Sequence, residues 1–212
     1  MPPFSAAAVE ESSVSPRAAE FIASVGAAPG GALEARLHAR VDDLIGYQDE
    51  AYARDFVNAV ARAAAAERTV APGEERFATA VASGLYKLMA YKDEYEVARL
   101  HLDPAMRRRI EHEFGRGART KLMFHPPVLR ALGLKRKVPL GRRFTPTLVA
   151  LRAGRRLRGT PIDPFGFAKV SRIERRLVAD YRAAVDDAIE TLSPQTLYCC
   201  RPRGLARPGA WV

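Results

Sequence analysis

The stretch ALEARLHARVDDLIGYQDEAYARDFVNAVARAAAAER, residues 32 to 68, decides the fold of this chain. Its apolar side chains recur at intervals of three and four, the spacing that gathers them on one face of an α-helix. They are Leu33, Leu37, Val41, Leu44, Ile45, Phe56, Val57 and Val60. Gly46 marks a bend or a break within the run, and the sequence TVAPG at 69–73 ends it.

Helical patterns continue along most of the remaining sequence. One helix is predicted from about Glu74 to Leu102, and Asp103-Pro104 has the cap and first-turn proline of a short helix that ends at Gly115. Residues 144–157 form a basic amphipathic pattern. Asp163-Pro164 predicts the start of a last, long helix. Its apolar stripe comprises Val170, Ile173, Leu177, Tyr181, Val185, Ile189 and Leu192.

These patterns predict a mainly α fold, a helical domain of about five or six helices. Residues 120–125 and 135–140 have the composition of two short strands, which predicts a small β hairpin or arm near 120–140. Residues 1–31 are expected to be a disordered leader, although 17–25 also fits a short helix. Residues 32–194 form the predicted helical domain, and 195–212 an irregular tail.

Composition restricts the class of protein. With 212 residues, 48% of them hydrophobic, the chain can bury one core. No apolar run approaches the ~20 residues that a membrane-spanning helix needs. The first residues lack the basic and apolar regions of a secretory signal. The two cysteines, Cys199 and Cys200, are adjacent, which gives no disulfide framework. We therefore expect a cytoplasmic protein that is not bound to a membrane.

The net charge of +10 is concentrated in one segment. Residues 107–158 contain 16 Lys and Arg against two acids, Glu111 and Glu113, whereas the remaining chain has 18 basic and 22 acidic residues. Such a segment is either a solvated surface or a docking face for a polyanion or an acidic protein. The candidate docking residues are Arg107, Arg108, Lys135, Arg136, Lys137, Arg142, Arg143, Arg155 and Arg156.

Motifs for catalysis or for cofactor binding are absent from the sequence. It contains no phosphate-binding glycine motif, no C-x-x-C and no H-x-x-x-H. We therefore predict no catalytic, cofactor-binding or metal-binding residues in this chain.

One segment, Tyr86 to His101, carries many polar side chains on an otherwise apolar helical pattern. Lys92 and Glu96 are four residues apart, the spacing of neighbours on one helix face. The favoured interpretation is a partly buried network that fixes how this helix contacts its neighbours. Surface ion pairs and catalysis by Asp93 or Glu94 are the alternatives. The candidate network comprises Tyr91, Lys92, Asp93, Glu94, Tyr95, Glu96 and Arg99.

Three blocks of the sequence resemble one family. They are LIGYQDEAYARDFV (44–57), LYKLMAYKDEYEVARLH (85–101) and LRGTPIDPFGFAKVSRIERRLVADY (157–181). In order and spacing they resemble the C-terminal domain of the fused bacterial indolepyruvate ferredoxin oxidoreductases, which are 2-oxoacid:ferredoxin oxidoreductases. The resemblance covers roughly 33–194. The domain itself has no assigned role.

The resemblance implies membership of a complex. The family carries out oxidative decarboxylation of aryl 2-oxoacids with coenzyme A and passes electrons to ferredoxin. Its thiamine diphosphate and iron–sulfur clusters are held by domains that this chain lacks. The expected function is therefore that of a non-catalytic accessory domain or subunit. Its expected partners are the catalytic subunits of such an enzyme or an acidic ferredoxin.

Two further expectations accompany this one. The alternative function is that of a free-standing basic module that binds nucleic acid or another polyanion. It is less favoured, because the sequence has no known nucleic-acid-binding motif. The ending LYCCRPRGLARPGAWV departs from the aliphatic helix of the family, which a truncation or a shifted reading frame would explain. Resequencing the locus tests that explanation, because an intact frame would exclude it.

Overall fold

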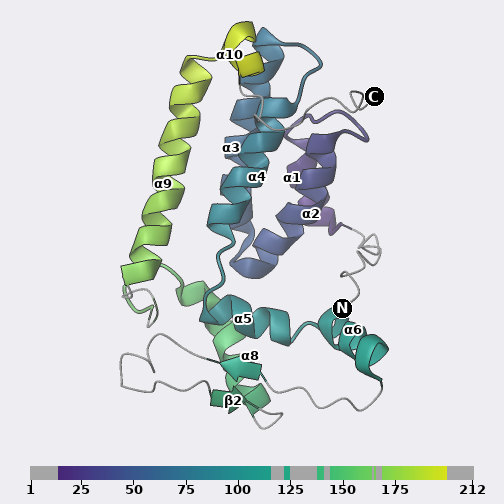
Figure 1. The fold of residues 1–212 in the computed structure, drawn as a ribbon, viewed down its shortest axis with the longest axis vertical. Coiled ribbons are helices and arrows are strands. Elements are labelled where there is room, and N and C mark those ends of the chain that lie inside the picture. The colour runs from purple at the N-terminus through teal and green to yellow at the C-terminus, as the bar shows by residue number, and fades with distance from the viewer. Residues whose placement is uncertain are drawn as a thin grey trace, which may run out of the picture.

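The computed structural model describes most of the chain as helices in two layers (Figure 1). The residues described are 14–115, 122–124, 138–140, 144–163, 165 and 169–199. The upper bundle contains α1 (Pro16–Ala23), α2 (Ala32–Tyr47), α3 (Glu50–Val70), α4 (Arg76–Met89) and α9 (Lys169–Glu190). The lower layer contains α5 (Glu94–His101), α6 (Pro104–Phe114), α8 (Thr145–Ala153), the 3-10 helix η2 (Gly154–Leu157) and strands β1 (Leu122–Phe124) and β2 (Val138–Leu140). A short helix, α10 (Pro194–Cys199), follows α9.

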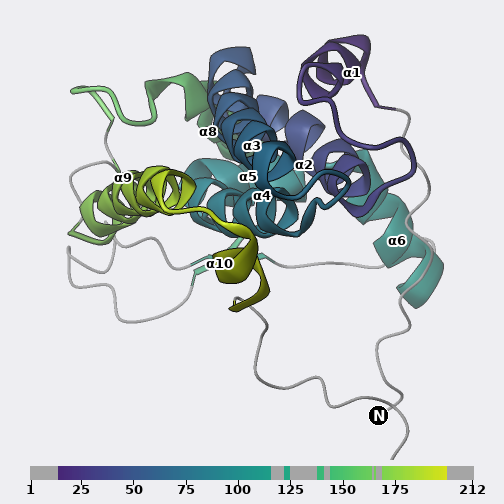
Figure 2. The same ribbon diagram turned by 90° about the horizontal axis from the view of Figure 1, so that it is seen from above.

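The predicted mainly α fold is confirmed, and the main core lies in the upper bundle. Seen from above, α3 and α4 lie between α9 on one side and α1 and α2 on the other (Figure 2). The predicted stripe of α2 and α3 supplies fully buried side chains, including Leu37, Val41 and Phe56. No helix in the described part of the chain is long and apolar enough to cross a bilayer.

The run at 32–68 contains a break, as predicted, and forms two helices. Helix α2 ends at Tyr47, and α3 begins after Asp49, whose carboxylate accepts a hydrogen bond from the backbone N–H of Tyr52 at 2.8 Å. A carboxylate in this N-cap position satisfies an amide that has no partner in the helix. The capping aspartate therefore places the break two to three residues after Gly46.

The single helix predicted from Glu74 to Leu102 is wrong, because the chain turns at 90–93. Asp93 has an extended backbone, and its carboxylate accepts a hydrogen bond from the backbone N–H of Glu96 at 2.8 Å. This N-cap starts α5 as a separate helix, which belongs to the lower layer. Together with α1 and α10, the break raises the number of α-helices to nine in the described residues, above the five or six expected.

The disorder predicted for residues 1–31 is wrong for α1, which packs into the core. Ser15 caps the helix, and its backbone N–H donates to a carboxylate oxygen of Asp42 on α2 at 2.8 Å. Phe21, Ile22 and Val25 are buried against the bundle. Burying each such side chain is worth about 1.5–3 kcal/mol, which offsets the entropy lost on ordering the segment. Residues 1–13 lie outside the described part.

Buried Glu67 fixes the turn between α3 and α4. Its side chain is fully buried, and its two carboxylate oxygens accept hydrogen bonds from the backbone N–H groups of Phe77 and Ala78, at 2.8 and 2.9 Å. Those amides belong to the first turn of α4, where the helix dipole favours a negative charge. A residue of α3 thus caps the helix that follows it.

Helix α9 begins later than predicted, at Lys169, and only part of its apolar stripe reaches the core. Tyr181 packs where Gly84 leaves no side chain on α4, and Val185 is buried. Ile173 and Leu177, which lie in the first half of α9, are 58% and 45% exposed. The side chain of Val170 lies outside the described part.

The predicted irregular tail is wrong for residues 195–199, which belong to α10. The side chain of Ser193 accepts a hydrogen bond from the backbone N–H of Thr196, and Pro194 occupies the first helical position. Leu197 of this helix is buried. Residues 200–212 lie outside the described part.

The strands β1 and β2 pair antiparallel, in line with the hairpin or arm expected near 120–140. The register places Leu122 opposite Leu140, and Phe124 opposite Val138. The connecting residues lie outside the described part.

Candidate functional site

The two layers meet at the C-terminal end of α2, where arginines of the lower layer bind backbone carbonyls. Arg158 donates from Nη1 to the carbonyl oxygen of Tyr47 at 2.6 Å, and Arg155 donates from Nε to that of Gln48 at 3.2 Å. The last carbonyls of a helix lack partners within the helix and carry its partial negative charge. Cationic donors at this position therefore supply the missing hydrogen bonds and also neutralise the partial negative charge.

Arg158 is also held by a buried ion pair with Asp93. Its Nε and Nη2 donate to the two oxygens of the carboxylate, the second at 2.8 Å, and the side chains are 5% and 7% exposed. The guanidinium carbon lies 3.7 Å from the centroid of the Tyr47 ring. Because Asp93 also caps α5, one carboxylate joins the start of that helix to the arginine.

Arg99 makes a second bridge between the layers. It donates to both carboxylate oxygens of Glu96 at 2.7 Å and to Asp43 on α2. The other oxygen of Asp43 accepts a hydrogen bond from the hydroxyl of Tyr86 on α4. Hydrogen bonding to Glu96, followed by the charge of Asp43, raises the pKa of Arg99 despite partial burial. The pair is less buried than Arg158–Asp93, with side-chain exposures of 20% and 29% for Arg99 and Asp43.

Asp163 organises the turn that follows η2. Its carboxylate accepts hydrogen bonds from the hydroxyl of Tyr95 at 3.0 Å, and from the backbone N–H groups of Gly159 and Phe165. The Tyr95 and Phe165 rings pack edge to face, with centroids 5.1 Å apart. Burial, and next the hydrogen bond to Asp163, raises the pKa of Tyr95. Asp163 therefore stabilises this turn. The sequence had indicated that it caps the last helix, but α9 begins six residues later, at Lys169.

These contacts form one unit, which we call the polar junction: Asp43, Tyr47, Asp93, Tyr95, Glu96, Arg99, Arg155, Arg158 and Asp163. Four of its members, Asp93, Tyr95, Glu96 and Arg99, belong to the network predicted from the sequence. The other members could not be identified from the sequence, because they come from segments up to 68 residues away from the network residues they contact. Only the three-dimensional contacts distinguish Arg158 from the other arginines of its basic segment.

The remaining predicted network residues lie at the edge of the junction. The Tyr91 ring packs edge-on against Tyr47, with centroids 6.3 Å apart, and burial raises the pKa of Tyr91 to about 12. Glu94 is buried, which raises its pKa. Lys92 is exposed and precedes α5, so it does not share a helix face with Glu96 as the spacing had indicated.

The predicted docking residues are only partly in the described chain. Arg107 and Arg108 are exposed on α6, a helix without a buried residue. Arg156 is exposed on η2, whereas Arg155 is half-buried through its bond to α2. The others, Lys135, Arg136, Lys137, Arg142 and Arg143, lie outside the described residues.

The chemistry available at the polar junction is that of a structural connector. Its carboxylates accept hydrogen bonds from arginine, from tyrosine or from backbone amides. Within the described ranges no three His, Cys, Asp or Glu side chains gather as metal ligands do. The hydroxyl of Tyr47 is buried and has no hydrogen-bond partner among the described residues, and burial strongly raises its pKa.

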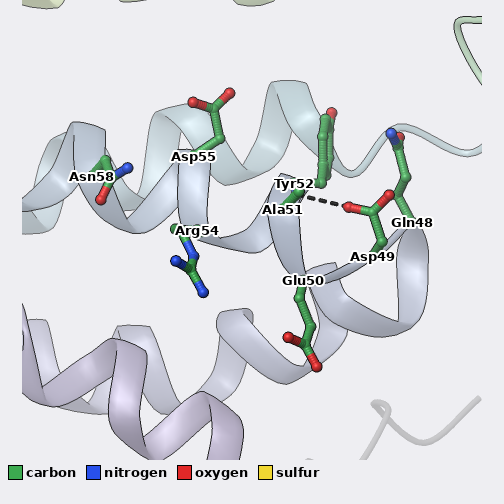
Figure 3. A pocket seen from close by; sticks show the side chains of 8 residues that line it. All are labelled: Gln48, Asp49, Glu50, Ala51, Tyr52, Arg54, Asp55 and Asn58. Carbon is green, nitrogen blue, oxygen red and sulfur yellow. Dashed lines mark hydrogen bonds between the residues drawn. The ribbon is translucent and has the colours of Figure 1, made fainter.

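A depression of about 780 Å³ lies elsewhere, along the first turns of α3 (Figure 3). Its lining residues are Gln48, Asp49, Glu50, Ala51, Tyr52, Arg54, Asp55 and Asn58. Their side chains point to different sides of the helix in Figure 3, and Asp49 is engaged in capping it. The depression is open and its polar groups do not converge, so it lacks the geometry of an enclosed binding site.

The fold and the polar junction define a mainly α domain built of two layers that arginine–carboxylate contacts hold together. The chain belongs to a family of unknown function (DUF6537), whose family model matches residues 33–201. No curated protein and no solved structure matches the chain.

Proposed function

We propose that this chain is a non-catalytic accessory domain or subunit of an indolepyruvate ferredoxin oxidoreductase-like enzyme. Such an enzyme decarboxylates aryl 2-oxoacids oxidatively and passes the electrons to ferredoxin. Its expected location is the cytoplasm. Membership of DUF6537 assigns no activity, so the proposal rests on the resemblance of three sequence blocks and on where their residues lie.

The observation that carries the proposal is that the three resembling blocks meet at the polar junction. Tyr47 comes from the first block, Asp93 from the second and Arg158 from the third, and they contact one another directly. The residues by which the chain resembles the family therefore hold its two layers together. This placement favours a role in shaping a docking domain over a role in turnover.

The residues of this chain do not fit the cofactors of the family. Iron–sulfur clusters are held by cysteine thiolates, usually four, and the chain has two, which are adjacent. The carboxylates of the junction are occupied by arginine and amide donors. In the proposed complex, other chains bind thiamine diphosphate and the clusters, and this chain contributes a surface.

Co-purification from the native cell tests the proposal. The tagged full chain, isolated at low ionic strength, is expected to bring down polypeptides that contain thiamine diphosphate and iron–sulfur clusters. Untagged cells provide the control for the resin. A chain that migrates alone at low salt would contradict the proposal, as would turnover of an aryl 2-oxoacid by the isolated chain.

Polyanion binding is the second candidate, and the exposed arginines of α8 and η2 favour it. A duplex DNA or RNA ligand would show affinity that falls steeply with salt, because phosphate contacts release counterions. Absence of retention on heparin would exclude this candidate.

A further inference from the structure

Large apolar side chains are exposed on one part of the described chain only. The exposed large hydrophobic residues are Met106, Phe114, Phe144, Val149, Leu157, Ile162, Ile173 and Leu177. All of them follow α5, whereas residues 14–101 expose none. These side chains belong to the lower layer and to the first half of α9, which makes this part of the chain the candidate for an interaction surface.

Helix α8 has one face that packs and one that does not. The packed side approaches α5 so closely that a Cβ atom at Gly154 would lie 3.1 Å from the Tyr95 ring. On the opposite side, Val149, Arg152 and Arg156 follow at intervals of three and four, which places them on one face of the helix and its 3-10 extension. Val149 is 52% exposed, both arginines are exposed, and Leu157, the residue after Arg156, is 37% exposed. We call these four residues the outer face of α8.

The charge of this face is uncompensated within the described residues. Arg152 and Arg156 have no ion pair there, whereas Arg99 and Arg158 are paired within the junction. The sequence from 114 to 162 contains no Asp or Glu. Burial, then the neighbouring charges of Arg152 and Arg156, lowers the pKa of Arg155. An acidic partner would relieve this repulsion between like charges.

Aliphatic side chains beside the arginines favour a protein partner over a nucleic acid. Non-specific binding of nucleic acid relies on phosphate contacts and on aromatic stacking, and Val149 and Leu157 offer neither. A protein interface combines an apolar centre with a polar rim, and arginine is enriched in it. The arrangement of Val149 and Leu157 beside Arg152 and Arg156 matches that description.

We propose that the outer face of α8 docks onto an acidic protein surface with an apolar centre. This inference rests on the proposed function, which places that surface on the catalytic subunits of the oxidoreductase. Charge complementarity of this kind speeds association and makes the affinity dependent on salt. The polar junction would hold α8 in the orientation in which this face is presented.

The test measures binding of the full chain to the purified subunits that contain thiamine diphosphate, at several ionic strengths. The variants are Arg152→Glu/Arg156→Glu, which reverses the charge, and Val149→Ser, which removes apolar surface. Arg36→Glu/Arg76→Glu is the matched control, because both arginines are exposed on the upper bundle and form no ion pair in the described residues. Circular dichroism and thermal unfolding of each variant report whether it folds.

We expect the charge-reversed α8 variant to bind about tenfold more weakly or worse at low salt, and the control to bind as the wild type does. Val149→Ser should weaken binding at low and at high salt. If wild type and α8 variants bind the subunits equally, the inference is overturned and the proposed function stands. If the wild type does not bind them, both fail. If the α8 variants lose only heparin or duplex DNA binding, the face is a polyanion site and the inference is wrong.

Discussion

Replacing Arg158 by alanine should destabilise the fold more than replacing any other arginine of its basic segment. The substitution leaves the Asp93 carboxylate, 7% exposed, without its cation, and removes a donor from the Tyr47 carbonyl. Removing one partner of a buried pair costs about 3–5 kcal/mol. The orphaned carbonyl contributes up to about 1–3 kcal/mol, which is not additive with the first loss. We expect a total loss of about 3–5 kcal/mol from a stability that is about 5–15 kcal/mol in typical domains.

Urea unfolding followed by circular dichroism measures this loss directly. For a domain of this size 1 kcal/mol corresponds to about 2–4 °C, so the melting temperature should fall by about 6–20 °C. Arg156→Ala is the matched control, because Arg156 is exposed two residues away, and it should change stability by no more than about 0.5 kcal/mol. A loss below about 1 kcal/mol in Arg158→Ala would refute the view that the junction holds the layers together.

Two more variants separate charge from geometry. Arg158→Lys keeps the charge but cannot form the bidentate contact with Asp93. Its free energy of unfolding should therefore lie between those of wild type and Arg158→Ala. Arg158→Met combined with Asp93→Asn removes the unpaired charge and should be more stable than Arg158→Met alone. A double variant as unstable as the sum of the single ones would show that the pair is not coupled.

Three other residues give separate predictions. Glu67→Ala removes the carboxylate that accepts from two amides of α4, so the free energy of unfolding in urea should fall by about 2–3 kcal/mol. Glu67→Gln should lower it less, and equal losses in the two variants would contradict the capping role. Tyr47→Phe removes a buried hydroxyl that has no partner in the described part of the chain, so stability should stay level or rise by about 1 kcal/mol. A clear loss would reveal a hydrogen bond to that hydroxyl. Burial raises the pKa of Glu94, so its protonated form is favoured in the folded state and its contribution to stability falls as pH rises through that pKa. Glu94→Gln should therefore be more stable than wild type near pH 7, and the difference in urea midpoint between them should shrink toward pH 4; a difference independent of pH would refute this.

The helices of the bundle could be predicted from the sequence because their stripes are long and regular. The start of α5 was missed although a signal was present, since Asp93 followed by Glu96 three residues later is close to the capping-box pattern. Ser15-Pro16 is likewise a signal for a helix start, with a capping serine and a proline at the first helical position. The Ala- and Ser-rich composition around it favoured disorder instead. Local start signals were thus more informative than the composition of the segments around them.

The candidate site could be predicted only in part, for a physical reason. Asp93 and Arg99 were identified because polar side chains on an apolar helix must find partners when buried. Their partners come from distant segments, and nothing local distinguishes Arg158 from Arg155 or Arg156. The exposure of Ile173 and Leu177 was likewise unpredictable, since helical periodicity indicates a face but not how far the neighbouring bundle extends.

Because arginines of the lower layer bind the last carbonyls of α2, the length of that helix sets the position of the lower layer. One inserted residue would rotate the terminal carbonyls by about 100° and turn the Tyr47 oxygen away from the guanidinium of Arg158. Apolar contacts are not directional and could shift to accommodate such a change. The bidentate hydrogen bonds of an arginine require one geometry. Insertions or deletions within α2 should therefore displace the lower layer, whereas equal changes within α6, which has no buried residue, should leave it in place.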